Sequence, residues 1–440
     1  MRLEYISISF GLSSLAYSLP QVLWGGRSYP ETQQVIQTGQ ANKGKSDFAD
    51  FRELISEQRY ISQAHRKGYE KPEFMVSDTF SGDGVPYSGI ASFGHLDWTD
   101  CYSEVNDGTF DIGIVGMPFD LGVTYRPGAR FGPGAVRMAS RRILPEASWD
   151  MDHRNNPFRD WATVVDCGDV ANTPFNKVEA VAQLTTGAKE ILSRTAKSQA
   201  NSSAVRMITI GGDHTISKRI GLHVILVLMK EAALPLLRAT YPKWGPVAVL
   251  HFDSHLDTWD PRKMNGGEAD KYSEITHGTM LHLAHEEGII SNNSNMHLGS
   301  RSMLFDKLGD LNNDARCGFD SIRAREIDSL GIDGIVQRVV DRVANQYVYV
   351  SIDIDVLDPA FAPATGTIEP GGWTTRELLL ILQGLANAGV KIIGADIVEL
   401  TPVYDNKAET SALLVVELVY ELLQWMVSVP VQPHEDNKMC

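Results

Sequence analysis

This chain of 440 residues has fewer positively charged residues than negatively charged ones. Lysine and arginine number 40 against 55 aspartate and glutamate residues, which gives a formal net charge of -15. This balance argues against a nucleic-acid partner, which would favour a basic face, and we expect none. The sequence also lacks any uninterrupted apolar run of about 20 residues, the length needed to cross a bilayer, so we expect no membrane span.

Cysteine is scarce and scattered. The four cysteines, Cys101, Cys167, Cys317 and Cys440, are far apart and lie outside every motif discussed below. Their spacing defines neither a disulfide framework nor a thiolate metal site. With 43% hydrophobic residues and no evident internal repeat, the chain is long enough to form one large core with extensions.

Metal-ligand side chains recur at alternate positions in one segment. His251-Phe-Asp-Ser-His-Leu-Asp257 places Asp253, His255 and Asp257 on one face of an extended strand. His251 shares this face, and we expect it to pack beside the ligands or support them from outside. One such triplet is weak support for a metal site, because solvated loop charges produce the same pattern.

Two further segments strengthen the interpretation. Ser351-Ile-Asp-Ile-Asp355 places Asp353 and Asp355 on one face of a second strand. An apolar segment, 206–210, leads into a Gly-Gly turn that carries His214 to the rim where the other strands end. Four carboxylates in one pocket repel one another unless cations lie between them, and this oxygen-rich set with two histidines suits Mn(II) and similar ions. We therefore predict a two-metal site.

Apolar segments alternate with helical or polar stretches along the chain. The segments expected to be strands are Asp111–Val115, Thr163–Val165, Arg206–Ile210, Val247–Phe252, Met296–Leu298, Tyr347–Ile354 and Lys391–Val398. This alternation predicts an α/β fold with a mostly parallel central sheet covered by helices on both faces. Ligands of such sheets bind beyond the carboxyl ends of the strands, where the predicted metal ligands fall.

The combined motifs resemble those of the ureohydrolase family, which comprises arginases, agmatinases and related guanidino-acid hydrolases. The resemblance extends from about Ser88 to about Leu423. The matching segments are Ser88–Phe93, Gly116–Asp120, Tyr125–Pro133, Gly211–His214, Asp253–Asp257, Thr276–Thr279, Ser351–Gly372 and Ala395–Pro402. The resemblance implies a three-layer α/β/α sandwich, two Mn(II) ions per chain and a homo-oligomer, a trimer or a hexamer.

The resemblance also implies roles for the site residues. Asp253 and Asp353 would bridge the ions; His214 and Asp257 would complete one metal site, and His255 and Asp355 the other. His277 matches the family histidine credited with proton shuttling, and Glu399 matches the glutamate that pairs with the guanidinium. For either residue the alternative is a purely structural or solvated side chain. Both metal ions would lower the pKa of a shared water and so supply the nucleophile for hydrolysis.

The choice of substrate is less constrained. Where arginases carry an asparagine after the metal motif, this chain has Trp259, which resembles agmatinases and guanidinobutyrases. We expect agmatine hydrolysis to putrescine and urea, a step of polyamine biosynthesis; 4-guanidinobutyrate or another guanidino acid is the alternative, and an inactive binding member of the family is a third. Glu286, Glu287 and Arg301 lie on a loop where distal charge could select the substrate. Arg126 and Arg130 could belong to a substrate loop or form ion pairs at subunit contacts.

The two ends and one insertion lie outside the common motifs. Residues 1–18 predict a secretory signal peptide, and residues 19–87 an N-terminal extension, before a catalytic domain over 88–430. A cleaved signal implies a secretory or extracellular location; the alternative is cytoplasmic or mitochondrial. Residues 218–233 predict an insertion, because the segment Leu234-Pro-Leu-Leu-Arg-Ala239 follows the His214 turn about 16 residues late. A retained intron and a genuine lineage insertion both explain it.

Overall fold

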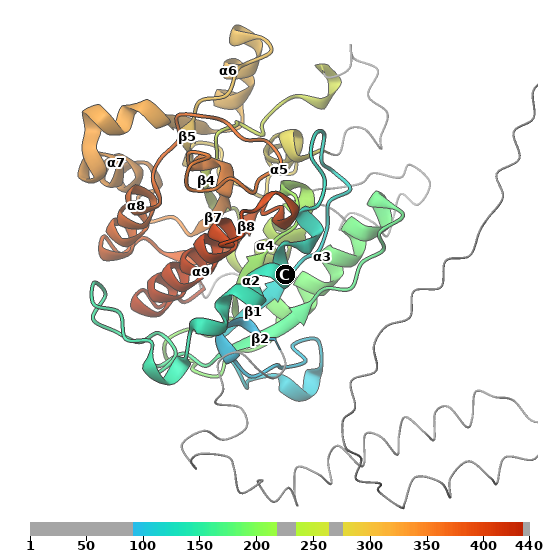
Figure 1. Cartoon of the computed structure of the whole chain (residues 1–440), viewed down its shortest axis with the longest axis vertical. Helices are drawn as coiled ribbons and strands as arrows, with labels where there is room; N and C mark the ends of the chain where they lie inside the picture. The colour runs from blue at the N-terminus through green and yellow to red at the C-terminus, as the bar shows by residue number, and fades with distance from the viewer. Residues whose placement is uncertain (1–90, 218–234, 264–275, 434–440) are drawn as a thin grey trace, which may run out of the picture. The chain divides into compact units, whose positions relative to one another are not determined.

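The computed structural model describes residues 91–217, 235–263 and 276–433 (Figure 1). The predicted signal peptide, the predicted extension and the insertion at 218–233 lie outside the described residues. One eight-stranded sheet has the order β2-β1-β3-β8-β7-β4-β5-β6, and all of its strand pairs are parallel. The strands are β1 (Ile112–Gly116), β2 (Val164–Asp169), β3 (Arg206–Ile210), β4 (Ala248–Phe252), β5 (Asn295–Ser300), β6 (Phe319–Arg323), β7 (Val348–Asp353) and β8 (Ile392–Val398).

Helices cover both faces of the sheet, so the predicted three-layer α/β/α architecture is confirmed. One face packs against α2 (Gly132–Ala139), α7 (Ile327–Val343), α8 (Thr375–Asn387) and α9 (Thr410–Ser428). The other packs against α3 (Lys177–Ser193), α4 (Pro235–Trp244) and α5 (Met280–Glu286), while α6 (Lys307–Arg316) precedes the edge strand β6. The central strands are buried along their whole length, which explains why they are continuous apolar runs.

Each segment that was predicted to be extended overlaps a strand, with bounds that differ by up to a few residues. The strand β6 was not predicted. It lies at the edge of the sheet, and only Phe319 and Ile322 of its five residues are buried. An edge strand with so few buried positions has no apolar run that would distinguish it from a polar loop.

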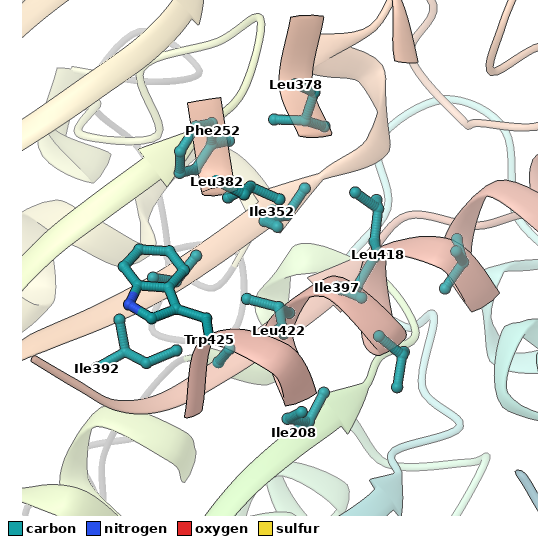
Figure 2. Close-up of a cluster of buried hydrophobic side chains, with 14 of the residues drawn as sticks. Ile208, Phe252, Ile352, Leu378, Leu382, Ile392, Ile397, Leu418, Leu422 and Trp425 are labelled. Carbon is teal, nitrogen blue, oxygen red and sulfur yellow. The ribbon is translucent and has the colours of Figure 1, made fainter. Parts of the chain in front are cut away.

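Helix α9 packs on the centre of the sheet. Leu418, Leu422 and Trp425 contribute to the same buried cluster as Ile397 and Ile392 of β8 (Figure 2). The indole Nε1 of Trp425 donates a hydrogen bond of 2.8 Å to a backbone carbonyl oxygen, that of Val390. This helix is long and apolar enough to cross a membrane, but 83% of its apolar window is buried inside the fold, which is typical of a core helix.

A disulfide joins Cys101 to Cys167 of β2, across a sequence separation of 66 residues. Sequence spacing did not reveal this pair. Both cysteines are buried, and so is Cys317, which has a free thiol. The disulfide links the segment before β1 to β2, the edge strand of the sheet. In the strand order, β1 separates β2 from the strands that carry the predicted metal ligands.

Candidate metal centre and substrate pocket

Four neighbouring strands position the predicted ligands. The order β3-β8-β7-β4 places four parallel strands side by side, so that their carboxyl ends meet at one edge of the sheet. The predicted site residues lie at these ends: His214 after β3, Asp253, His255 and Asp257 after β4, Asp353 and Asp355 at the end of β7, and Glu399 after β8. His277 begins the short 3-10 turn before α5. The structure therefore brings together side chains that are up to 185 residues apart in the sequence.

The Gly-Gly turn after β3 allows two loops to approach closely. A Cβ atom on Gly212 would lie 1.7 Å from the carbonyl oxygen of Phe119, so only glycine fits there. The backbone N–H of Glu399 donates to the Gly212 carbonyl at 2.9 Å. The N–H of His214 donates to Glu399 Oε1, also at 2.9 Å. These contacts fix the position of Glu399 relative to His214.

The ligand atoms form two groups. In the first, His214 Nδ1 lies 3.2 Å from Oδ2 of Asp253, 3.2 Å from Oδ2 of Asp257 and 3.6 Å from Oδ2 of Asp353. In the second, His255 Nδ1 lies 3.1 Å from Asp253 Oδ1 and 3.0 Å from Asp355 Oδ2. Asp253 contributes one oxygen to each group and so occupies the position that a bridging ligand would need.

His251 belongs to the first group as well. Its Nε2 atom lies 3.2 Å from Asp253 Oδ2 and 4.0 Å from Asp257 Oδ2. The ligand atoms of His214, His251, Asp253 and Asp257 all lie within 4.8 Å of one another. The sequence placed His251 on the same strand face as Asp253, but it did not show that the imidazole turns toward the other ligands.

Several buried atoms of the site have no hydrogen-bond partner. They are His214 Nδ1, His251 Nε2, Asp253 Oδ2 and Glu399 Oε2. Unpaired buried polar atoms are rare and costly, so a cluster of them is typical of a site that binds a cation or a substrate. Nitrogen and carboxylate donors around two adjacent groups fit a dinuclear metal site.

The electrostatics lead to the same conclusion. Burial raises the pKa of Asp353 well above its ordinary value, and the neighbouring Asp355 and Asp253 raise it further. Burial lowers the pKa of His214, but Asp253, Asp257 and Asp353 outweigh burial and raise this pKa well above the usual value. The cluster therefore attracts protons strongly, which is the behaviour of a site whose excess negative charge is otherwise neutralised by cations.

A hydrogen-bonded chain orients His214. Tyr349 and Ser351 donate through their hydroxyls to the two carboxylate oxygens of Asp396, each at 2.7 Å. Because the Ser351 proton is used in this way, its oxygen accepts from His214 Nε2 at 2.8 Å. A neutral His214, the form that binds a metal ion, therefore carries its proton on Nε2 and directs its Nδ1 lone pair at the carboxylates.

His277 lies between Glu399 and the loop after β1. Its Nδ1 is 3.2 Å from Glu399 Oε1, and its Nε2 is 2.8 Å from the hydroxyl oxygen of Thr124. Burial lowers the pKa of His277, but Glu399 outweighs burial and the result is a pKa of about 9. Thr124 was not identified from the sequence, because a lone threonine in a loop gives no signal of its own.

A small cavity of about 80 Å³ opens onto the metal ligands, and His277, Trp259, Thr124 and Thr367 line its walls. A Cβ atom on Gly278 would lie 2.5 Å from the Trp259 ring, and the ring packs edge-on against Phe305 at 4.9 Å between centroids. The indole therefore forms one fixed wall of the cavity.

The charged residues between 286 and 306 that were considered for substrate selection form ion pairs or hydrogen bonds within the chain. Glu286 pairs with Arg316, and Glu287 with Arg238. Arg301 donates to several backbone carbonyl oxygens, among them that of Asp355 at 2.6 Å. All three residues therefore already have partners within the chain, which a sequence does not reveal, and their part in substrate selection stays a prediction.

The arginines of the loop after β1 also differ from each other. Arg130 forms an ion pair with Asp120 within the chain. Arg126 stacks over the rings of Tyr125 and Tyr404, at 5.1 and 5.4 Å. Its carbonyl oxygen is 3.1 Å from a Cβ built on Gly366, and that Cβ is 3.5 Å from Glu399 Oε2. The Arg126 loop is thus part of the pocket wall.

The fold and site together define a class of metal-dependent α/β proteins in which parallel strand ends carry buried carboxylates and imidazoles. The comparisons with known proteins agree with this class. The family model described as the arginase family matches residues 110–224 and 230–424. The chain therefore belongs to the arginase family.

Named relatives lie within the same family. A Schizosaccharomyces pombe protein named "Putative agmatinase 1" is 44% identical over 395 residues, which cover 86% of this chain and 95% of the relative. An agmatinase of Neisseria meningitidis serogroup C is 32% identical over 353 residues, 79% of this chain and 94% of its own length. The solved structure of proclavaminate amidino hydrolase from Streptomyces clavuligerus is similar with a TM-score of 0.64 and 30% identity, covering 78% of this chain and 99% of that one.

Proposed function

We propose that the protein hydrolyses a guanidino compound to urea and an amine with the help of two Mn(II) ions. The observation that carries this proposal is the buried pair of ligand groups that share Asp253, next to a carboxylate, Glu399, whose Oε2 has no partner. When bound, the ions would lower the pKa of water from about 15.7 toward 7 and so supply a nucleophile at neutral pH. The oxygen-rich ligand set favours Mn(II).

The ligand assignment follows the two groups. His214 and Asp257 would hold the ion on one side, His255 and Asp355 the ion on the other, and Asp253 would bridge them. For Asp353 a bridging role is supported by its position: it lies 3.6 Å from His214, and the charges of Asp355 and Asp253 affect its pKa.

Glu399 is suited to binding the guanidinium. Its Oε1 already accepts from the His214 N–H and lies near His277, while its Oε2 is buried and unpaired. A planar cation placed against Oε2 would gain a charge-assisted hydrogen bond. The absence of a side chain at Gly366 leaves room beside this oxygen.

His277 is suited to protonating the amine that leaves. Its pKa of about 9 means that it holds a proton at neutral pH, chiefly because Glu399 is negative. A cationic substrate bound to Glu399 offsets that negative charge and lowers the pKa of His277. The proton therefore becomes easier to release when the substrate is in place.

Agmatine is the favoured substrate, and 4-guanidinobutyrate is the alternative. The Glu369 carboxylate lies 3.8 Å from His255 Nε2 with 37% of its side chain exposed, so it could attract a distal ammonium group. Arg126, stacked on two tyrosines beside the pocket, would instead favour a distal carboxylate. The similarity to proteins named agmatinase supports the first choice.

Urea release is the direct test. The full chain is supplied with Mn(II) and assayed against agmatine, 4-guanidinobutyrate and arginine, with Glu399→Gln as a variant that should keep its metal but lose activity. We expect agmatine to be the best substrate. Faster release from guanidinobutyrate would favour the alternative, and no release from any of the three by a metal-loaded protein would favour a binding role.

We also propose a secretory location and a homo-oligomeric state. The buried Cys101–Cys167 disulfide supports the location, because disulfides persist mainly in oxidising compartments. Thiol titration of the native protein and N-terminal sequencing of secreted material would test the location, and sedimentation analysis would test the oligomeric state.

A further inference from the structure

His251 is the one member of the first ligand group to which the proposed function gives no role. It is fully buried on β4, where it faces His297 of β5 and Ser351 of β7 in the strand register. Its ring stacks on that of His214 at 5.0 Å with an interplanar angle of 25°. Its Nε2 atom is directed at the oxygens of Asp253 and Asp257 and has no hydrogen-bond partner.

On the opposite side of its ring, His251 contacts a row of buried, hydrogen-bonded side chains. The Nδ1 atoms of His251 and His297 lie 2.9 Å apart. His297 Nε2 lies 2.8 Å from Asp314 Oδ1, and the hydroxyl of Thr258 donates to the same oxygen at 2.7 Å. His297 itself stacks on the ring of Phe319 at 4.1 Å. The rings therefore cannot turn without breaking several contacts.

The direction of hydrogen bonding follows from counting protons along this row of side chains. The Asp314 carboxylate is an acceptor, so His297 presents its proton on Nε2. A neutral His297 then has a lone pair on Nδ1, and the short Nδ1–Nδ1 contact requires His251 to donate from its own Nδ1. A neutral His251 is left with a lone pair on Nε2. This is the arrangement by which Ser351 and Asp396 orient His214.

A lone pair on His251 Nε2 faces carboxylate oxygens, which are themselves electron-pair donors, at 3.2 and 4.0 Å. Such an arrangement is repulsive unless a cation lies between the atoms. We propose that His251 is a further nitrogen ligand of the ion on the His214 side, and that His297 and Asp314 are positioning residues that fix its tautomer. This inference rests on the proposed metal centre and adds a ligand to it.

A matched pair of variants tests the ligand. Asparagine at position 251 places an amide near the position of Nδ1 and can still donate to His297, but it removes Nε2. Glutamine places its amide near Nε2 and removes the Nδ1 donor. With one Mn(II) per chain, pulsed electron paramagnetic resonance should detect one fewer histidine nitrogen in both variants. Chelator competition should show weaker metal binding, by about 10-fold or more for His251→Asn, and a smaller loss for His251→Gln, whose amide oxygen can still bind.

Asp314→Asn tests the positioning role. An asparagine can donate to His297 Nε2, which reverses the direction of hydrogen bonding along the row and leaves a proton on His251 Nε2. We expect metal affinity to fall by about 10-fold, as is typical for residues that support a ligand. His153→Asn is the control: its ring contacts Glu421 at 2.8 Å, away from the ligands, and metal affinity should be unchanged.

The outcomes separate the two proposals. If the wild-type protein binds no Mn(II), the proposed function itself is wrong. If the wild type binds metal and the nitrogen couplings and affinity of the His251 and Asp314 variants equal those of the wild type, His251 is instead an imidazolium that only donates to Asp253, and this inference is overturned. Should the His251 variants fail to fold, measured by thermal unfolding in excess chelator, the Asp314→Asn result decides.

Discussion

The metal ligands and the mouth of the pocket, by which we mean the loops that carry Tyr125 and Phe305, are built in different ways. The ligands lie at the ends of central strands, and His214 and Asp253 are 0% and 1% exposed. At the mouth, Tyr125 and Phe305 are 67% and 78% exposed and belong to loops. The ends of neighbouring strands position the first region, whereas the conformation of longer loops determines the second. We therefore expect substitutions at the ligands to act on metal content, and substitutions at the mouth to act on substrate choice.

The largest effect is expected at the bridging position. Asp353→Ala should abolish metal binding, whereas Asp355→Ala should lose mainly the ion on the His255 side, because Asp355 contacts His255 at 3.0 Å, while Asp353 lies 3.6 Å from His214 and is proposed to bridge both ions. Metal content per chain, measured by elemental analysis of the dialysed variants, is the readout. Equal retention of metal by the two variants would show that Asp353 does not bridge.

His277 should separate chemistry from metal binding. His277→Asn should leave metal content unchanged and slow turnover by about 10²–10⁴-fold, the range typical of a lost proton transfer. Imidazole added to the buffer should restore part of the rate, since it can carry the same proton. A variant with wild-type turnover would assign His277 a structural role only.

The difference between the two regions also explains what the sequence could predict. The alternate spacing of Asp253, His255 and Asp257 predicted one shared face of a strand, but β4 ends at Phe252 and the three residues lie on the segment that follows it. The spacing therefore identified the ligands without giving their backbone conformation. The same spacing identified Asp353 and Asp355, although only Asp353 belongs to β7 and Asp355 lies in the 3-10 turn Ile354–Val356. The direction of the His251 ring was not predictable, because it depends on His297, which is 46 residues away and belongs to another strand.

The mouth could not be predicted for a related reason. Glu286, Glu287 and Arg301 were considered as sources of distal charge, and their partners, such as Arg316, come from other elements. Thr124 reaches His277 through a contact that spans 153 residues. Periodicity carries information about strands and helices, but it carries none about which loop side chains meet.

Substitution of Trp259 should have an intermediate effect, which changes kcat/KM and leaves metal content unchanged. Trp259→Asn removes the wall that packs on Gly278 and should lower kcat/KM for the preferred substrate by about 10-fold, the usual loss when apolar contact in a pocket is removed. Metal content should stay constant. Phe305→Ala is the control, since Phe305 contacts the outer edge of the Trp259 ring and is largely exposed; it should change kcat/KM less. A loss of metal from Trp259→Asn would mean that the wall also supports the ligands.

The smallest effect is expected from two partly buried charges near the pocket, Glu369 and Arg126, and it separates the candidate substrates. Because Glu369 is half-exposed, solvent screens it, and pairing with a distal ammonium is worth only about 0.2–1 kcal/mol. Glu369→Gln should therefore lower kcat/KM for agmatine by about 2- to 5-fold and leave guanidinobutyrate unaffected or improved. Arg126→Gln, which neutralises the opposite charge, should reverse this preference. Both changes should shrink at high ionic strength, because salt screens exposed charges. If Glu369→Gln instead loses metal, the Glu369 carboxylate of the wild type supports His255, which is 3.8 Å away. Glu369 would then help to hold the metal rather than select the substrate.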